Sequence, residues 1–416
     1  MMSLKNTDPK LAELIKKEQQ RQQETLMLIP SENYASEAVQ QAVGSCLANK
    51  YAEGYPRRRY YQGQAYVDQI EQLAIERAKK LFNVPHANVQ PYSGSPANAA
   101  VYMALLQAGE KIMGMKLSSG GHLTHGHPKI TFSGKFFQPV QYQVGKDGWL
   151  DYQAIEKLAL KHRPKLIITG YTAYPRIVEW QKFSAIAKKV GAWLMADISH
   201  IAGLVIAGVH PSPVPYAELI TTTTHKTLRG PRGAMILVTQ KGLQKDSQLA
   251  KKIDRAVFPG LQGGPHLNSI AGIAVCLKQA ASANFKKYAQ QIVKNAQALV
   301  KELINQGFEL VTGGTDNHLI LIDLRKQGVD GKTAAVVLEA AGLVVNYNTI
   351  PYDPNPPRCP SGIRLGTPAV TSRGMGELQM KKIAHWFKQA IDSRDSTKEL
   401  DKIKKEVKAL CRKYPL

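Results

Sequence analysis

One lysine, Lys226, lies in a setting that could activate an amine for chemistry. Threonines at 221–224 and His225 come directly before it, and a Gly-Pro-Arg-Gly run at 230–233 follows. The threonines predict a strand that ends near Lys226, and the apolar residues 234–239 predict a second buried strand after a turn. A partly desolvated amine beside cationic groups has a lowered pKa, so more of it is the free base that attacks carbonyl carbons. Lys226 could therefore form a Schiff base, although a solvated turn lysine explains these residues at least as well.

Two further ionisable residues, Asp197 and His200, follow another predicted strand. Residues 166–169 and 193–197 are apolar runs typical of buried strands, and apolar residues recur at helical spacing between them. A strand, a helix and a strand in this order predict a largely parallel sheet with helices on its faces. Ligands of such sheets bind at the carboxyl edge of the strands, so Asp197, His200 and Lys226 are expected at one edge. A helix cap is the alternative for Asp197.

Ser93, Gly94 and Ser95 precede a predicted helix that runs from Pro96 to about residue 107. Ser95 suits the N-cap position and Pro96 the first helical position. The hydroxyls and free backbone N–H groups would then lie at the positive end of the helix, where they could bind a phosphate. Capping alone also explains Ser95.

A loop at 51–63 carries four tyrosines, one glutamate and three arginines, with little apolar surface to bury. Loops of this kind usually bind ligands or partners. Stacking of arginine on tyrosine in a surface turn could explain Arg57 and Arg58, but it explains Tyr51, Glu53 and Tyr61 less well.

Other isolated features extend this set of binding groups. Three histidines at 122–127 suggest a metal, but no acidic or cysteine ligand accompanies them, so His122 fits stacking or proton transfer better. Arg364, in a short apolar strand, needs an anionic partner such as a substrate carboxylate, with a structural salt bridge as the alternative. The glycine-rich loop 258–265 could reach a phosphate, even across a subunit boundary. Neither a dinucleotide-binding fingerprint nor a P-loop is present, and the remaining groups fit pyridoxal phosphate.

The composition indicates a globular protein of more than one domain, since the chain has 416 residues, of which 44% are hydrophobic and 21% charged. Four scattered cysteines form no CxxC pair, which favours a reducing compartment. The N-terminus lacks a signal-peptide core and no apolar run approaches the roughly 20 residues that span a bilayer, so a cytoplasmic protein is expected. The net charge of +23 suggests nucleic-acid binding, but the basic residues are interleaved with acids and accompany no RNA-binding motif. A solvated basic surface is the preferred explanation, with attraction of polyanionic small molecules left open.

Three regions are expected along the chain. Residues 1–24 form an N-terminal arm with an amphipathic helix over 8–24, which could pack on a neighbouring subunit. Residues 25–280 form the large domain. Residues 281–416 form a smaller α/β domain, reached through helices over 267–306 that are interrupted near 282–284. Its predicted strands are 308–311, 319–324 and 343–346, and its predicted helices are 332–341, 376–393 and 397–412.

Many separate motifs together carry a family resemblance. They are SENY, NKYAEGYP with RYYQG, the SGS-helix junction, GGHLTHG, ADISHIAGL, TTTTHKTLRGPRG, FPGLQGG, NHLILIDL and SGIRLGTPA. Over nearly its full length the chain resembles a serine hydroxymethyltransferase. The resemblance implies a fold-type I pyridoxal-phosphate enzyme, with a mostly parallel seven-stranded sheet in the large domain and a smaller C-terminal α/β domain. It also implies a homodimer that interconverts serine plus tetrahydrofolate with glycine plus methylenetetrahydrofolate. A folate-independent aldolase acting on threonine-like amino acids is the enzymatic alternative, and an RNA-binding protein on an inactive scaffold is the third hypothesis.

The same resemblance implies a role for each matching residue. Lys226 forms the Schiff base, Asp197 pairs with the ring nitrogen, His122 stacks on the ring and His200 lies by the phenolic oxygen. The residues implied near the phosphate are Ser93, Gly94, Ser95 and His225, and Thr223 joins the catalytic set. Ser31 and Arg364 are implied to hold the amino-acid carboxylate, with Glu53 in proton transfer. The residues implied to reach the site from the neighbouring subunit are Tyr51, Glu53, Tyr61, Gly263 and Gly264. The pterin is implied to contact Leu117, Gly121, His122, Leu123 and Asn348, and no metal is expected.

Overall fold

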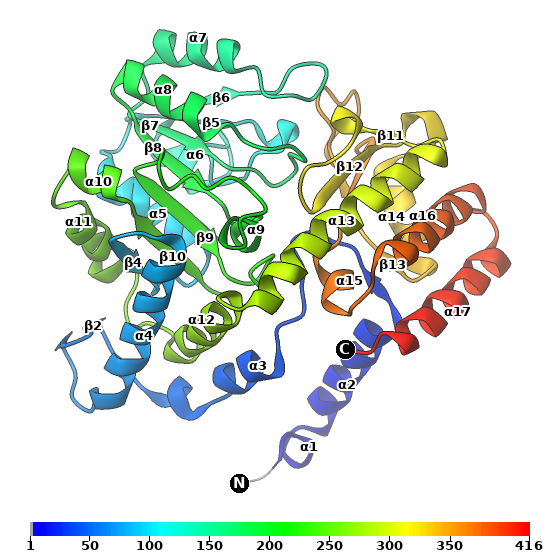
Figure 1. The fold of residues 1–416 in the computed structure, drawn as a ribbon, viewed down its shortest axis with the longest axis horizontal. Helices are drawn as coiled ribbons and strands as arrows, with labels where there is room; N and C mark the ends of the chain where they lie inside the picture. The colour runs from blue at the N-terminus through cyan, green and yellow to red at the C-terminus, as the bar shows by residue number, and fades with distance from the viewer. Residues whose placement is uncertain (1–2) are drawn as a thin grey trace. The chain divides into compact units, whose positions relative to one another are not determined.

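The computed structural model describes residues 3–416, which divide into two compact units (Figure 1). The larger unit is continuous and contains Ala35–Gln290. The smaller unit combines the residues through Tyr34 with Gln291–Leu416. This division differs from the expected one, because residues 25–34 group with the C-terminal part of the chain. The reason is that β1 (Leu26–Met27) pairs in parallel with β13 (Leu343–Val344).

A seven-stranded sheet forms the centre of the larger unit, with the order β4-β10-β9-β8-β7-β5-β6. Its strands are β4 (His86–Asn88), β5 (Lys111–Met115), β6 (Gln138–Tyr142), β7 (Leu166–Thr169), β8 (Trp193–Asp197), β9 (Leu219–Thr223) and β10 (Ala234–Val238). The five strands from β6 to β9 in this order pair in parallel, and β10 runs antiparallel to both β9 and β4. The predicted mostly parallel sheet of seven strands is thus confirmed.

Helices cover this sheet. Those of the larger unit are α3 (Glu37–Val43), α4 (Ala65–Phe82), α5 (Gly94–Leu105), α6 (Phe132–Phe136), α7 (Tyr152–His162), α8 (Trp180–Val190), α9 (Ala202–Ile206), α10 (Gln240–Lys245), α11 (Leu249–Arg255) and α12 (Leu267–Ala280). Helix α5 packs on β9 and β10, and α8 packs on β7 and β8. Helix α8 ends where predicted, at Gly191, which adopts a left-handed conformation with φ of 72°.

The smaller unit contains a four-stranded antiparallel sheet with the order β11-β12-β15-β14. Its strands are β11 (Glu309–Leu310), β12 (Leu319–Asp323), β14 (Asn346–Asn348) and β15 (Gly362–Gly366). The single strand predicted over 343–346 is wrong. The chain forms two short strands there, because β13 pairs with β1 whereas β14 pairs with β15.

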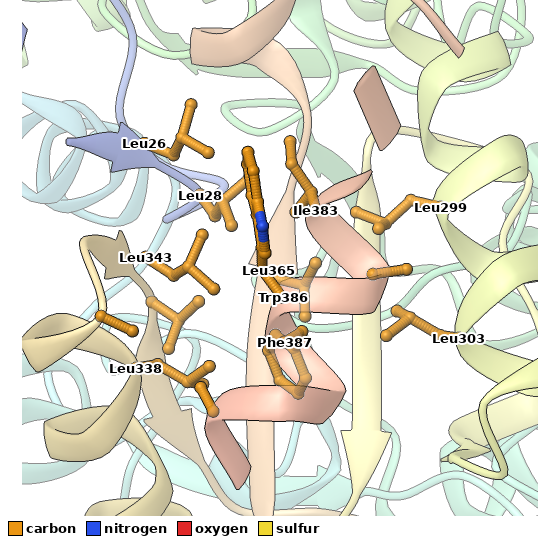
Figure 2. Close-up of a cluster of buried hydrophobic side chains, with 14 of the residues drawn as sticks. Leu26, Leu28, Leu299, Leu303, Leu338, Leu343, Leu365, Ile383, Trp386 and Phe387 are labelled. Carbon is orange, nitrogen blue, oxygen red and sulfur yellow. The ribbon is translucent and has the colours of Figure 1, made fainter. Parts of the chain in front are cut away.

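One apolar core holds the smaller unit together. Its helices are α1 (Leu4–Thr7), α2 (Pro9–Glu24), α14 (Gly331–Ala340), α15 (Pro368–Ser372), α16 (Glu377–Asp392) and α17 (Thr397–Lys413), and α13 (Ala283–Asn305) runs through the boundary between the units. Figure 2 shows Leu26 and Leu28 of the N-terminal segment beside the same core as Trp386 and Phe387 of α16. Leu26 and Leu28, which directly follow the predicted arm, are therefore part of this core, whereas helices α1 and α2 contain no buried residue.

Arg373 ties the N-terminal helix to the C-terminal helix within this unit. Its buried guanidinium donates hydrogen bonds of 2.8–3.1 Å to five backbone carbonyls. The acceptors are the carbonyl oxygens of Gln22, Gln23, Thr25, Cys411 and Tyr414. The last carbonyls of a helix lack partners within the helix and carry partial negative charge, so one cation here satisfies the ends of both α2 and α17.

Replacing Arg373 with methionine should lower the free energy of unfolding by about 2–4 kcal/mol, because buried carbonyls lose their donors while apolar volume is kept. The thermal midpoint should fall, and amide hydrogen exchange should accelerate in the last turn of α2. Arg412→Met, at an exposed arginine of α17, is the matched control. Equal exchange rates in α2 for the two variants would contradict this role of Arg373.

Candidate functional site

Lys226 lies on the turn that follows β9. All five residues of β9 are buried, and Lys226 itself is half-buried. The backbone N–H of Gly230 donates to the carbonyl of Thr224 at 2.7 Å, and that of Arg229 donates to the carbonyl of Lys226 at 3.0 Å. A Cβ atom at Gly230 would lie 2.6 Å from Sγ of Cys276, so only glycine allows this close approach. The turn thus holds Lys226 at the carboxyl end of its strand.

Asp197 ends β8, the parallel neighbour of β9. Its Oδ2 accepts hydrogen bonds from Nδ2 of Asn98 at 2.9 Å and from Nε2 of His125 at 3.1 Å. Its Oδ1 accepts from the backbone N–H of Ser199 at 3.1 Å and from the hydroxyl of the same residue at 2.6 Å. Burial alone would raise the pKa of this carboxyl, but the hydrogen bond and the charge of His125, with smaller effects that include the hydrogen bond from Asn98, outweigh it and hold the pKa well below its usual range. Asp197 is therefore a buried, ionised carboxylate.

The residues that hold Asp197 were not predicted from the sequence. Asn98 comes from α5, His125 from the loop after β5, and Ser199 from the turn after β8. Asn98 could have been noticed as one polar residue in an otherwise apolar stretch of helix, and His125 as a neighbour of His122. Their hydrogen bonds to Asp197 have no signal in local spacing.

His122 lies next to this carboxylate network. Its Nδ1 is 2.7 Å from the hydroxyl of Thr124, which in turn lies 2.9 Å from Nδ2 of Asn98. The rings of His122 and His125 have centroids 5.5 Å apart. The structure therefore joins His122 to Asp197 through a continuous series of hydrogen bonds.

The N-terminus of α5 brings Ser93, Gly94 and Ser95 toward β9. The helix begins at Gly94 with Ser93 as its N-cap, so the predicted N-cap at Ser95 is wrong by two residues. Ser93 makes no side-chain capping bond, and the side chains of Ser93 and Ser95 are exposed. A Cβ atom at Gly94 would lie 2.8 Å from Cγ2 of Thr223, so the glycine lets the helix end approach the end of β9 closely. Serine hydroxyls and helix N–H groups thus lie near the strand that leads to Lys226.

Two more predicted histidines are positioned by the same turns. Burial, together with the charges of Arg232 and Lys226, lowers the pKa of His225 to about 3, so its ring is neutral at physiological pH. Nη1 of Arg232 lies 3.3 Å from Nε2 of that ring. His200 is buried, and its backbone carbonyl accepts a hydrogen bond from the hydroxyl of Thr227 at 2.9 Å, which fixes it beside the turn of Lys226.

The tyrosine-rich loop forms its own cluster with the glycine turn at 263–264. Rings of Tyr51 and Tyr61 meet edge to face at 5.0 Å, and their hydroxyls lie 3.3 and 3.5 Å from the two carboxylate oxygens of Glu53. A Cβ atom at Gly263 would lie 3.1 Å from Oε1 of Glu53, and one at Gly264 would lie 3.4 Å from the ring of Tyr51. These five predicted residues therefore meet at one place in the larger unit.

A buried ion pair anchors this loop. Nη2 of Arg59 lies 2.6 Å from Oε2 of Glu71 and its Nε lies 2.9 Å from Oδ1 of Asp68. The same guanidinium donates to the backbone carbonyls of Ala52 and Gly54 at 2.9 Å. Arg59 thus fixes the backbone on both sides of Glu53.

Ser31, Arg364 and Asn348 belong to the smaller unit. Arg364 lies in β15, where burial lowers its pKa to about 10, and its Nε donates to Oδ1 of Asn346 at 3.1 Å. The N–H of Gly366 donates to the carbonyl of Leu28 at 2.7 Å, so the segment that leads to Ser31 lies beside the end of β15. Asn348 ends β14, next to the start of β15.

The other residues predicted for a pterin follow β5. Leu117 and Leu123 are exposed. A Cβ atom at Gly121 would lie 2.1 Å from the carbonyl oxygen of Met115, so the loop folds back on the end of its strand. Leu117, Gly121, His122 and Leu123 therefore come from one short loop.

Between residues 3 and 416, no group of three or more His, Cys, Asp or Glu side chains could hold a metal ion. In the same range no helix is both long and apolar enough to cross a membrane. All four cysteines are free thiols.

Comparison with known proteins identifies related chains. A family model described as serine hydroxymethyltransferase matches residues 4–387. A serine hydroxymethyltransferase of Acidothermus cellulolyticus is 57% identical over 388 residues, which cover 93% of this chain and 89% of the relative. One of Desulfotalea psychrophila is 53% identical over 415 residues and covers 100% of this chain and 96% of the relative. One of Acinetobacter baumannii is 52% identical over 416 residues, with 100% and 98% covered.

Proposed function

Because the chain belongs to the serine hydroxymethyltransferase family, we propose that the residues around Lys226 and Asp197 form its catalytic site. The chain is a pyridoxal-phosphate-dependent glycine hydroxymethyltransferase that interconverts serine and tetrahydrofolate with glycine and methylenetetrahydrofolate. The observation that carries the proposed site is the buried, ionised carboxylate of Asp197 on the strand next to that of Lys226.

The residues present fit pyridoxal phosphate. Bound there, the cofactor would supply a protonated ring that withdraws electrons from the amino-acid α-carbon. Asp197 remains ionised in a buried position, so it can keep a ring nitrogen protonated. Lys226 is half-buried at the strand edge, where its amine can hold the aldehyde carbon. Ser93 and Ser95 present exposed hydroxyls at the positive end of a 12-residue helix, which suits a phosphate.

We assign the remaining contacts as follows. His122 would stack on the ring, His200 would lie by the phenolic oxygen and His225 would donate to the phosphate as a neutral imidazole, which its low pKa supports. Thr223 packs against Gly94 and so fixes the helix end beside the strand. Each of these residues would bind or orient the cofactor, and we propose that the amine of Lys226 also takes and returns protons at the amino-acid carbon.

Substrate binding is proposed for the smaller unit. Arg364 would bind the amino-acid carboxylate with its guanidinium fork, together with Ser31. The bond from Nε of Arg364 to Asn346 supports this role, because it sets the plane of the guanidinium from one side. The pterin would contact the loop residues Leu117, Gly121, His122 and Leu123 of the larger unit.

A homodimer with shared sites is proposed from the tyrosine cluster. Tyr51, Glu53, Tyr61, Gly263 and Gly264 would complete the site of the neighbouring subunit, with Glu53 transferring protons at the serine hydroxyl or the folate. This is supported by unusual exposure of aromatic groups around the cluster, 74% for Tyr60 and 80% for Tyr66, since such groups are commonly covered at interfaces.

The remaining assignments concern domains, compartment and partners. We propose that the larger unit is the cofactor-binding domain and the smaller unit the C-terminal domain. A cytoplasmic location is supported by four free cysteines. Serine, glycine and tetrahydrofolate are the partners, without membrane or specific nucleic-acid binding. No relative found here favours the folate-independent aldolase.

Mixing two inactive variants tests both the residues and the sharing of sites. Homodimers of Glu53→Gln and of Lys226→Gln should form little methylenetetrahydrofolate from serine and tetrahydrofolate. After subunit exchange, half of the dimers should be heterodimers with one intact site each, so activity should return to about one quarter of the wild-type value. A parallel assay without tetrahydrofolate separates this reaction from folate-independent cleavage.

The matched control for this experiment mixes two preparations of Lys226→Gln that carry different tags. Exchange is measured by recovery of both tags in one complex. If both tags are recovered together and the mixture of Glu53→Gln and Lys226→Gln stays inactive, Glu53 and Lys226 act within the same subunit and the shared site is wrong.

A further inference from the structure

The ring nitrogen Nδ1 of His122 faces two groups of Thr124. The Thr124 hydroxyl lies 2.7 Å away, and its backbone N–H donates to this nitrogen at 3.2 Å. A backbone N–H can only donate, so this bond favours an Nδ1 that accepts and carries no proton, and at 3.2 Å it is the longer of the two contacts. An imidazole without a proton on Nδ1 is neutral and carries its single proton on Nε2.

Asn98 donates a hydrogen bond to the hydroxyl oxygen of Thr124. Nδ2 of Asn98 lies 2.9 Å from Oδ2 of Asp197 and also 2.9 Å from the hydroxyl oxygen of Thr124. An ionised carboxylate only accepts hydrogen bonds, so the amide must present its NH₂ group to Asp197, and therefore to Thr124 as well. Oδ1 of Asn98 accepts from the hydroxyl of Thr221 at 2.7 Å, which agrees with this orientation.

Asn98 thus donates to one of the two lone pairs of the Thr124 oxygen, and the Thr124 hydroxyl proton can donate to Nδ1 of His122. Asn98 is 1% exposed and Thr124 4%, so water does not compete for these bonds. Asp197 and His125 are the ionisable groups beside His122 in this network. The negative charge of Asp197 favours a protonated imidazole, whereas the two donors at Nδ1 oppose it. A proton on Nδ1 would face the backbone N–H of Thr124 and would force the Thr124 hydroxyl proton to turn away from Nδ1, which is unfavourable.

We propose that Thr124 is a positioning residue that, oriented by Asn98, holds His122 as the neutral imidazole with its proton on Nε2. The inference deepens the proposed function, since it concerns the ring assigned to stack on the cofactor. A neutral ring can lie against a protonated pyridine ring without charge repulsion, whereas an imidazolium would repel it. Thr124 would then raise cofactor affinity without touching the cofactor.

Nitrogen NMR on the holoenzyme tests this directly. Protein labelled with 15N-histidine is measured as a sedimented solid, and His122 is assigned by the signals lost in His122→Gln. The wild-type ring should show an unprotonated Nδ1 and a protonated Nε2. In Thr124→Val a second ring state with a protonated Nδ1 should appear, because one donor is lost. The dissociation constant for pyridoxal phosphate should rise about fivefold, the equivalent of one hydrogen bond. Thr124→Ser keeps a hydroxyl and should restore the wild-type signals.

Thr172→Val is the matched control, because the Thr172 hydroxyl donates to the carbonyls of Gly120 and Gly121 in the same loop. It should leave the resonances of His122 unchanged. A protonated Nδ1 in the wild type overturns the proposal, even if no variant folds. The proposal is also overturned if the His122 signals of Thr124→Val are the same as those of the wild type, or if Thr172→Val shows the same second ring state. If the wild-type protein does not cleave serine, the proposed function is wrong. The nitrogen resonances of His122 test only the present proposal.

Discussion

Lys226→Gln lowers the turnover number with serine by at least about 1000-fold, yet the variant still binds pyridoxal phosphate. Glutamine has nearly the length of lysine but no nucleophilic amine, so neither capture of the aldehyde nor proton return to the amino-acid carbon can occur. The hydroxyls at the start of α5 and the carboxylate of Asp197 remain, so non-covalent binding persists. Turnover is measured by steady-state formation of methylenetetrahydrofolate and bound cofactor by its absorbance after gel filtration.

Lys241→Gln provides the matched control within the larger unit. Nζ of Lys241 lies 2.8 Å from Oε1 of Glu218 and 2.9 Å from the hydroxyl of Ser184, so this lysine is partly buried and paired like a structural one. Its replacement tests whether the loss of any such lysine lowers turnover. Multiple turnovers at a normal rate in Lys226→Gln would remove Lys226 from the mechanism.

Asp197→Asn should lower the turnover number by about 100- to 1000-fold and also destabilise the protein by about 1–3 kcal/mol. The first effect arises because an amide carries no negative charge to keep a ring nitrogen protonated. The second arises because four donors, from Asn98, His125 and Ser199, point at the two carboxylate oxygens. An amide must turn its own NH₂ group toward two of them.

Both effects are measured on one preparation, by steady-state turnover and by the urea midpoint. Asp254→Asn is the control, because Asp254 also accepts hydrogen bonds, from His86 at 2.9 Å and from Asn88 at 2.8 Å, outside the proposed site. It should change the urea midpoint but not the turnover number. Near-normal turnover of Asp197→Asn would exclude its role at the ring nitrogen.

The elements that the sequence predicted well are those with uninterrupted patterns. Strands β7 and β8 were predicted to the residue because each is a continuous apolar run that ends at a polar residue. Strands β5 and β6 were missed for local reasons. Gly114 interrupts the apolar sequence pattern of β5, and a glycine is present because the backbone of His125 lies where a side chain would be. Pro139 interrupts the pattern of β6, which is an edge strand, where proline is tolerated.

The site was predictable where an ionisable residue follows a predicted strand directly. Lys226 and Asp197 stand at strand ends, and the rule that ligands bind at that sheet edge brings them together. Their supporting residues were not predictable in this way. Asn98 and His125 bond to Asp197 from 99 and 72 residues away along the chain, and only the packing of α5 and of the loop after β5 creates those contacts.

The pairing of β1 with β13 imposes an order on the co-translational folding of this protein. On the ribosome Leu26 emerges about 300 residues before its partner Leu343, a delay of about 15–60 s at 5–20 residues per second. The larger unit can close during that interval, because Ala35–Gln290 is continuous. Leu26, Met27 and Leu28 are buried in the folded protein, so they stay exposed to solvent until β13 has been synthesised. For most of synthesis the nascent chain therefore exposes an apolar segment near its N-terminus, which chaperones can bind until the C-terminal strands have been synthesised.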